Sequence, residues 1–150
     1  MAEISAKESL ERAFRMVGNI AKGVDERFGA EGRKLLAQIV GGMGSEMGKS
    51  SRSSCPAEDF KTVGMFWHNM VITIFGIEGR VEEKEAEVVF YYSECPYGLE
   101  GTSRELCEAM MAQAEKFIEA LGPKLTMETR KTVAVGDPEC EIAVKPKDKP

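Results

Sequence analysis

The hydrophobic pattern of this chain changes its period near Gly76. Before that point, apolar residues recur three and four positions apart, which is the spacing of one face of an α-helix. After it come two pairs of segments rich in β-branched and aromatic residues, with one strongly capped helical segment between the pairs. This order predicts an α+β fold in which helices pack on an antiparallel sheet.

The expected elements follow from that pattern. The predicted helices cover residues 5–28, 31–47, 56–75 and 103–121, and the predicted strands cover 77–83, 86–94, 124–135 and 139–145. Gly29 is expected to end the first helix, and glycines in the second lower its helix propensity. Thr102 and Glu105 form a capping box, and Gly122 with Pro123 ends the last helix. We therefore expect N-terminal helices and one long C-terminal helix on a sheet of about four strands, arranged as two hairpins.

A single domain is expected over residues 1–150, with a helical half at 1–76, a sheet-containing half at 77–145 and a flexible tail at 146–150. A chain of this length buries roughly two-thirds of the surface that its unfolded form exposes. The fold therefore needs neither a metal nor disulfides for stability, and a cofactor would be functional.

Net charge and hydropathy limit which partners the chain is expected to bind and in which cellular compartment it is expected to lie. The net charge of -5 gives no basic surface for nucleic acid. The longest apolar run, at residues 70–75, is far shorter than the roughly 20 residues of a membrane span, and the N-terminal segment lacks the apolar core of a signal peptide. A cytoplasmic chain is expected, in which thiols stay reduced. Its four cysteines then serve as ligands, reactive groups or core residues.

Three of the cysteines are predicted to meet at one end of the sheet. Cys95 follows the second strand, Cys107 lies in the second turn of the next helix, and Cys140 stands near the start of the last strand. Because consecutive elements reverse direction, these positions share one end of the domain. The same reasoning places Cys55 at the opposite end and makes His68 a candidate fourth ligand.

Three thiols and one imidazole suit either zinc or an iron–sulfur cluster. Zinc takes four nitrogen or sulfur ligands, clusters take thiolates, and a helix N-terminus lowers thiol pKa values. The metal hypothesis thus assigns Cys95, Cys107, Cys140 and His68 as ligands. No closely spaced pair such as CxxC occurs. Core packing explains the cysteines equally well, because free cysteines are often buried.

Two further hypotheses concern small molecules. Trp67, Tyr91 and Tyr97, together with His68, are predicted to line a ligand pocket between helix and sheet. Packing in the core is the alternative for these aromatic residues.

A hydrolase is the rival interpretation. Cys95 or Cys140 would be the thiolate nucleophile, and His68 or Asp137 would carry the proton. A purely structural, partner-binding subunit is the third interpretation.

The second half of the chain resembles a known family. The segment CPYG from Cys95, the pair LC at 106–107 and the hairpin METRKTVAVGDPECEI at 127–142 resemble the L-2-amino-thiazoline-4-carboxylic acid hydrolase-like family. They are also similar to 4-vinyl-reductase-type ligand-binding domains and methanogen output domains. The resemblance covers residues 60–145, and its specific part is the spacing of Gly136, Asp137 and Cys140.

This resemblance implies helices on an antiparallel sheet, a fold shared distantly with haem nitric-oxide sensors and vesicle-tethering subunits that enclose an apolar ligand. It implies either hydrolysis that opens a cyclic thiazoline at a C–N bond, or binding of a small molecule or metal by an accessory or regulatory domain. Tyr97 and Gly98 follow the Cys-Pro pair where a second nearby cysteine would complete a metal knuckle. A homodimer, or a place in a larger complex, would cover the apolar edge that such a sheet leaves.

Overall fold

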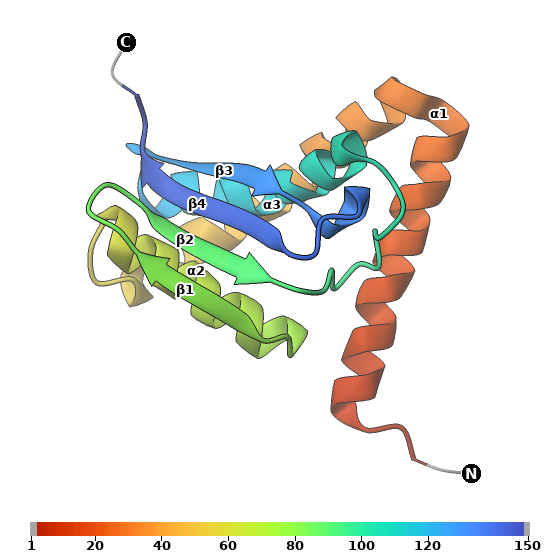
Figure 1. Ribbon diagram of the computed structural model, residues 1–150, viewed down its shortest axis with the longest axis horizontal. Helices are drawn as coiled ribbons and strands as arrows, with labels where there is room; N and C mark the ends of the chain where they lie inside the picture. Colours follow the sequence, from red (N-terminus) through yellow and green to blue (C-terminus); the bar gives the residue numbers. More distant parts are fainter. Residues whose placement is uncertain (1–2, 149–150) are drawn as a thin grey trace.

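The computed structural model describes residues 3–148 and confirms the α+β class (Figure 1). Its helices are α1 (Ala6–Ser51), α2 (Phe60–Phe75) and α3 (Arg104–Leu121), its strands are β1 (Gly79–Glu83), β2 (Val88–Tyr92), β3 (Leu125–Lys131) and β4 (Cys140–Pro146), and short 3₁₀ turns are η1 (Arg52–Ser54) and η2 (Val133–Val135).

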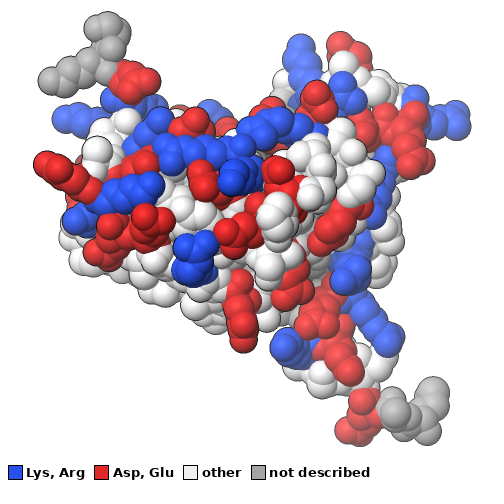
Figure 2. Space-filling view, viewed as in Figure 1, with Lys and Arg blue, Asp and Glu red and all other residues white. Residues whose placement is uncertain are grey.

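The four strands form one antiparallel sheet in the order β1-β2-β4-β3. The consecutive pairs β1–β2 and β3–β4 are the two predicted hairpins, and the central pair β2–β4 aligns Tyr92 with Cys140. Helices α2 and α3 cover one face of the sheet (Figure 1). Figure 2 shows both signs of charge interspersed over the opposite face, which is the face toward the viewer. Helices therefore cover one side of the sheet, and charged side chains lie over the other.

The longest helix is α1, at the N-terminus, and not the C-terminal helix that the sequence predicts. It joins the two predicted N-terminal helices at Gly29, whose φ of 57° and ψ of -135° are not helical. Glycine adopts a positive φ without the steric cost that a Cβ would bring. The chain therefore bends at this residue and continues as a helix without an intervening loop (Figure 1).

Glycines in the second half of α1 bring its backbone against α3. A Cβ on Gly44 would overlap the carbonyl oxygen of Gln113, and one on Gly48 would lie 2.6 Å from the Cβ of Ala120. Gly44 and Gly48 lower the helix propensity of α1, but the close packing of α1 on α3 requires them. For this reason α1 continues to Ser51, beyond the predicted end of the second helix.

Two helix starts differ from the prediction. Helix α2 begins at Phe60 and not at Pro56, because the side chain of Asp59 caps it. Helix α3 is capped by Ser103, whose hydroxyl accepts a hydrogen bond from the backbone of Leu106 at 3.1 Å. The predicted cap Thr102 instead lies one residue before the capping position.

The main core lies between α2, α3 and the inner face of the sheet. Its largest fully buried side chains include Phe90 of β2 and Phe117 of α3. At the C-terminus, Pro146 ends β4, and residues 149–150 of the predicted tail lie outside the described residues. Within residues 3–148, no helix is both long and apolar enough to cross a membrane.

Candidate functional site

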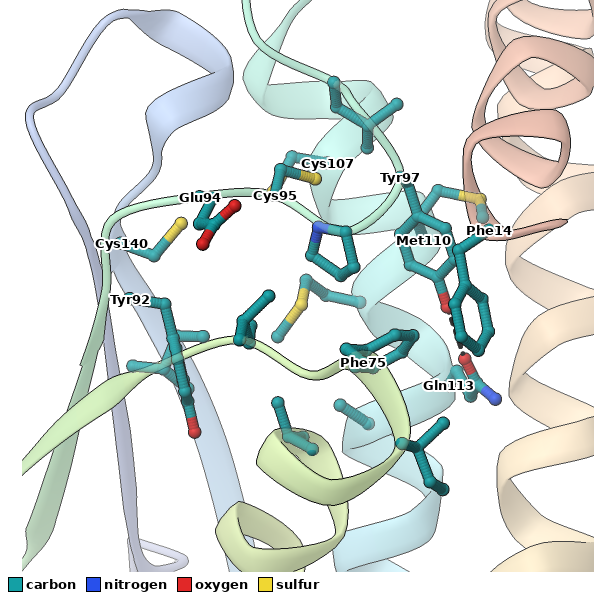
Figure 3. Close-up of a pocket in the computed structure, with 18 of the residues that line it drawn as sticks. Phe14, Phe75, Tyr92, Glu94, Cys95, Tyr97, Cys107, Met110, Gln113 and Cys140 are labelled. Carbon is teal, nitrogen blue, oxygen red and sulfur yellow. Dashed lines mark hydrogen bonds between the residues drawn. The ribbon is translucent and has the colours of Figure 1, made fainter. Parts of the chain in front are cut away.

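A cavity of about 350 Å³ lies where β2 ends and β4 begins, between the three helices and the sheet (Figure 3). Its walls are mainly apolar. The aromatic residues that line it come from all three helices, from β2 and from the loop that follows β2: Phe14, Trp67, Phe75, Tyr92, Tyr97 and Phe117. Of the residues predicted to form a pocket, Trp67 and Tyr97 therefore lie at this cavity.

The first half of α1 closes the cavity on one side. Phe14 packs edge-on against Phe75, with ring centroids 4.5 Å apart, and against Tyr97 at 6.3 Å. Figure 3 shows these three rings together beside α1. Within the first half of α1, Phe14 alone lines the cavity, and most of this half of the helix is exposed.

The three cysteines predicted to converge all line this cavity. Cys95 comes from the loop after β2, Cys107 from α3, and Cys140 from the first position of β4. Cys55 lies outside the cavity, in the segment before α2. The topology thus brings the three thiols to one space, as strand and helix directions require.

The thiols are held in their neutral form. Burial raises the pKa of Cys95, of Cys107 and of Cys140 above the usual range of a cysteine. The hydroxyl of Thr132 also lies 3.2 Å from the sulfur of Cys107. The pKa-lowering effect expected from the N-terminus of α3 is therefore outweighed by desolvation, and the thiols are weak nucleophiles at neutral pH.

The donors present do not fit a metal ion. Within residues 3–148, no group of three or more His, Cys, Asp or Glu side chains could hold one. His68 stands outside the cavity lining: its Nδ1 lies 2.7 Å from the hydroxyl of Tyr92, and its ring stacks on Phe90 at 5.1 Å. Burial lowers the pKa of His68, which keeps the ring neutral. The imidazole thus belongs to the core beside the cavity.

Asp137, the candidate proton carrier, has a structural role. Its carboxylate accepts a hydrogen bond from the backbone of Thr132 at 2.9 Å and so closes the turn between β3 and β4. It does not line the cavity. The geometry therefore pairs neither Asp137 nor His68 with a cavity thiol.

Tyr91 lies on the charged face of the sheet, away from the cavity. Its hydroxyl donates to Glu82 at 3.0 Å, and the guanidinium of Arg80 lies 3.9 Å from its ring centroid. Tyr92, the next residue along the strand, takes the inward position instead. Alternation along a strand could have identified it, because Tyr92 shares a face with Phe90.

Two polar residues that line the cavity, Glu94 and Gln113, were not predicted from the sequence. Glu94 supplies the one carboxylate among the described lining residues. The amide of Gln113 accepts a hydrogen bond from the hydroxyl of Tyr97 at 2.9 Å and donates to the sulfur of Met47 at 3.5 Å. Glu94 gave no sequence signal, because it lies in a loop without a motif.

Solved structures with this fold hold small molecules. A trafficking protein particle complex subunit 3 from Naegleria fowleri, covalently bound to palmitic acid, matches with a TM-score of 0.64 and 15% identity over 93% of this chain and 96% of its own. The phenol-responsive sensory domain of the transcription activator PoxR, with phenol, matches with a TM-score of 0.57 and 21% identity over 89% of this chain and 74% of its own. At these identities the likeness establishes the fold. Among curated proteins, none matches.

The sequence also matches a family model. The match runs over residues 9–144, and the family is described as L-2-amino-thiazoline-4-carboxylic acid hydrolase. It covers both the helical half and the sheet, and thus extends the resemblance seen at residues 60–145. The chain belongs to the L-2-amino-thiazoline-4-carboxylic acid hydrolase family.

Proposed function

We propose that this chain binds a small, predominantly apolar molecule in the cavity between α1, α2, α3 and the sheet. The observation that carries the proposal is the cavity itself, with a volume of about 350 Å³ and mainly apolar walls. Ligand pockets commonly occupy about 300–1,000 Å³ and combine apolar walls with a few polar groups. Tyr97, Gln113 and Glu94 supply polar groups of this kind.

The lining suits ligands of varied shape. Four methionines contribute to it: Met47, Met70, Met110 and Met111. Their flexible, polarizable thioethers adapt to irregular shapes and make favourable contacts with aromatic rings. In this proposal the three cysteines act as further sulfur-bearing wall residues, since their thiols are neutral.

The solved structures of the same fold support this proposal. One holds palmitic acid and the other phenol, and both ligands have a large apolar part. A chain with this fold and a mainly apolar internal space is therefore suited to the same general class of ligand.

The proposal is tested by filling the cavity. Ala114 of α3 lines it, and Ala114→Phe places a ring in the space. We expect the purified variant to fold and to lose at least about tenfold in affinity for the neutral apolar dye Nile red, measured by fluorescence. Ala86→Phe, at the exposed tip of the β1–β2 hairpin, is the matched control. Equal dye affinity in both variants would contradict the proposal.

A thiol-dependent hydrolase is the second candidate, favoured by the family and by the presence of Glu94 among the three cavity thiols. In that reaction a thiol would add to the ring carbon between sulfur and nitrogen and pass its proton to Glu94. The ring C–N bond would then break as Glu94 returns the proton to the leaving nitrogen, and water would release the carbon from the enzyme sulfur and restore the thiol. Incubation with 2-amino-thiazoline-4-carboxylate, followed by mass spectrometry of the ring-opened product, tests it. Turnover that Glu94→Gln, Cys95→Ser and Cys140→Ser all leave unchanged would contradict this assignment.

A further inference from the structure

A second, polar pocket of about 140 Å³ adjoins the apolar cavity. Six residues line both spaces: Phe14, Phe75, Ile77, Glu94, Cys95 and Pro96. The two spaces are therefore neighbours, and together they are called the tract. Its inner part is apolar, and its outer part lies between the start of α1, the end of α2 and the loop after β2.

The charged residues of the tract gather at its outer end. Lys7, Glu11 and Arg15 extend from the first turns of α1, and Glu94 extends from the loop after β2. Glu94 is also the innermost of the four, because it alone lines the apolar cavity as well. The tract therefore changes from apolar to charged along its length.

Two of these four charges lack an ionic partner. Lys7 and Glu11 form an ion pair with a separation of 4.0 Å between Nζ and Oε1. Among residues 3–148, neither Arg15 nor Glu94 takes part in an ion pair. One cation and one anion thus face the pocket without a counter-ion from the protein.

The protein leaves room for the Arg15 side chain beside the loop that carries Cys95. One guanidinium nitrogen of Arg15 lies 3.5 Å from the position that a Cβ on Gly98 would take. The guanidinium therefore stands next to the turn formed by residues 95–98, which directly follows Glu94 in the chain. Because Arg15 and Glu94 both line the polar pocket, a head group held there would face both charges.

We infer that the ligand is amphipathic and zwitterionic: an apolar body fills the cavity, an ammonium group faces Glu94, and a carboxylate faces Arg15. This inference rests on the proposed function, because it assumes that the cavity holds the apolar body. The charge order favours it, since Glu94 lies nearer the apolar part and Arg15 lies nearer the solvent. A purely anionic head would meet the charge of Glu94, and a purely cationic head would meet that of Arg15.

Four probes with chains of similar length separate the contributions of the two charges. They are 2-aminodecanoic acid, which is zwitterionic, decanoic acid, which is anionic, decylamine, which is cationic, and decan-1-ol, which is neutral. Isothermal titration calorimetry with the full chain should rank 2-aminodecanoic acid first. We expect its affinity to exceed that of decan-1-ol by about five- to tenfold.

Two variants assign the head-group contacts. Arg15→Gln should weaken 2-aminodecanoic acid and decanoic acid by about fivefold and leave decylamine no weaker. Glu94→Gln should weaken 2-aminodecanoic acid and decylamine and leave decanoic acid no weaker. Arg12→Gln and Glu83→Gln are matched controls, because both residues are exposed and lie outside the tract. Thermal unfolding of each variant verifies that the fold is retained.

The outcomes separate this inference from the proposed function. If decan-1-ol binds as tightly as 2-aminodecanoic acid and neither variant changes any affinity, the cavity binds apolar chains but the zwitterionic head group is refuted. If both variants lower thermal stability and alter no affinity, Arg15 and Glu94 contribute to stability and not to binding, which also refutes the zwitterionic head group. If no probe binds and Nile red does not bind either, the proposed function fails.

Discussion

Strand β2 passes through two different environments along its length. At its start Val88 and Phe90 are fully buried, with 0% exposure, in a closely packed core. At its other end Tyr92, and Cys95 just beyond it, face an open cavity. One strand therefore contributes both to the packing that stabilises the fold and to the space proposed to bind a ligand.

The difference arises from what covers each end. Rings of α2 fill the space at the packed end, where the Trp67 ring lies 5.5 Å from that of Phe90. At the hollow end the wall is completed by the first half of α1, which reaches the site through Phe14. Stability and binding are thus concentrated in adjacent parts that share Trp67, as expected where binding regions belong to the less densely packed part of a domain.

The largest expected effect on stability comes from removing a side chain at the packed end of β2. Phe90→Ala removes a fully buried ring that contacts Trp67 and His68, and should lower the free energy of unfolding by about 3–5 kcal/mol. Urea unfolding followed by circular dichroism measures it. Phe28→Ala is the control, because Phe28 is 62% exposed, and should change the free energy by less than about 0.5 kcal/mol. Similar changes in the free energy of unfolding for the two variants would show that the packed end of β2 does not stabilise the fold.

The next effect concerns the contact between α1 and α3. A Cβ on Gly44 would overlap the backbone of Gln113, whereas a Cβ on Gly42 would meet nothing within 4 Å. Gly44→Ala should therefore destabilise the fold by about 1–3 kcal/mol, since the two helices must separate. Gly42→Ala should stabilise it by about 0.5–1 kcal/mol through helix propensity. Thermal unfolding compares them, and the same sign in both would contradict close packing at Gly44.

These glycines mark the limit of prediction from the sequence. Helices and hairpins were predictable because their hydrophobic periods and turn residues are local signals. One sequence does not distinguish a glycine that merely lowers helix propensity, such as Gly42, from a glycine that a neighbouring helix requires, such as Gly44. For the same reason Gly29 predicted a helix end, although the structure uses it as a bend within α1.

The site was predictable as far as topology determines it. Chain direction alone was enough to predict that Cys95, Cys107 and Cys140 lie at one end of the domain, where the structure has the cavity. The chemistry of that space depends on lateral packing, which decides that His68 contacts Tyr92 and that Asp137 closes a turn. Such contacts join residues from different elements and leave no periodic signal.

A smaller effect should appear as a pH dependence at the border between the two regions. Burial lowers the pKa of His68 below the usual value of a histidine, 6.5, so near that pH the unfolded chain binds a proton that the folded chain does not. The free energy of unfolding should therefore fall as the pH decreases from 6.5 to 5.5, by less than about 1.4 kcal/mol per pH unit.

His68→Gln should remove this slope, and the assignment is direct because the chain has one histidine. Urea unfolding at several pH values provides the measurement. An unchanged slope in the variant would show that His68 does not titrate differently in the folded and unfolded states.

The smallest effect is expected at the thiols of the hollow end. Because burial raises the pKa of Cys95, Cys107 and Cys140, the thiolate fraction at pH 7 is lower than that of a free cysteine. Iodoacetamide should modify these three residues more slowly than it modifies the same cysteines in the urea-unfolded chain, as peptide mass spectrometry can follow. The rate should rise only as the pH passes the usual pKa of a cysteine, about 8.5. If one cavity cysteine instead reacts at pH 7 faster than in the unfolded chain, that thiol is activated. The hollow end would then be a reactive site and not only a binding space, and the hydrolase would become the better account of this chain.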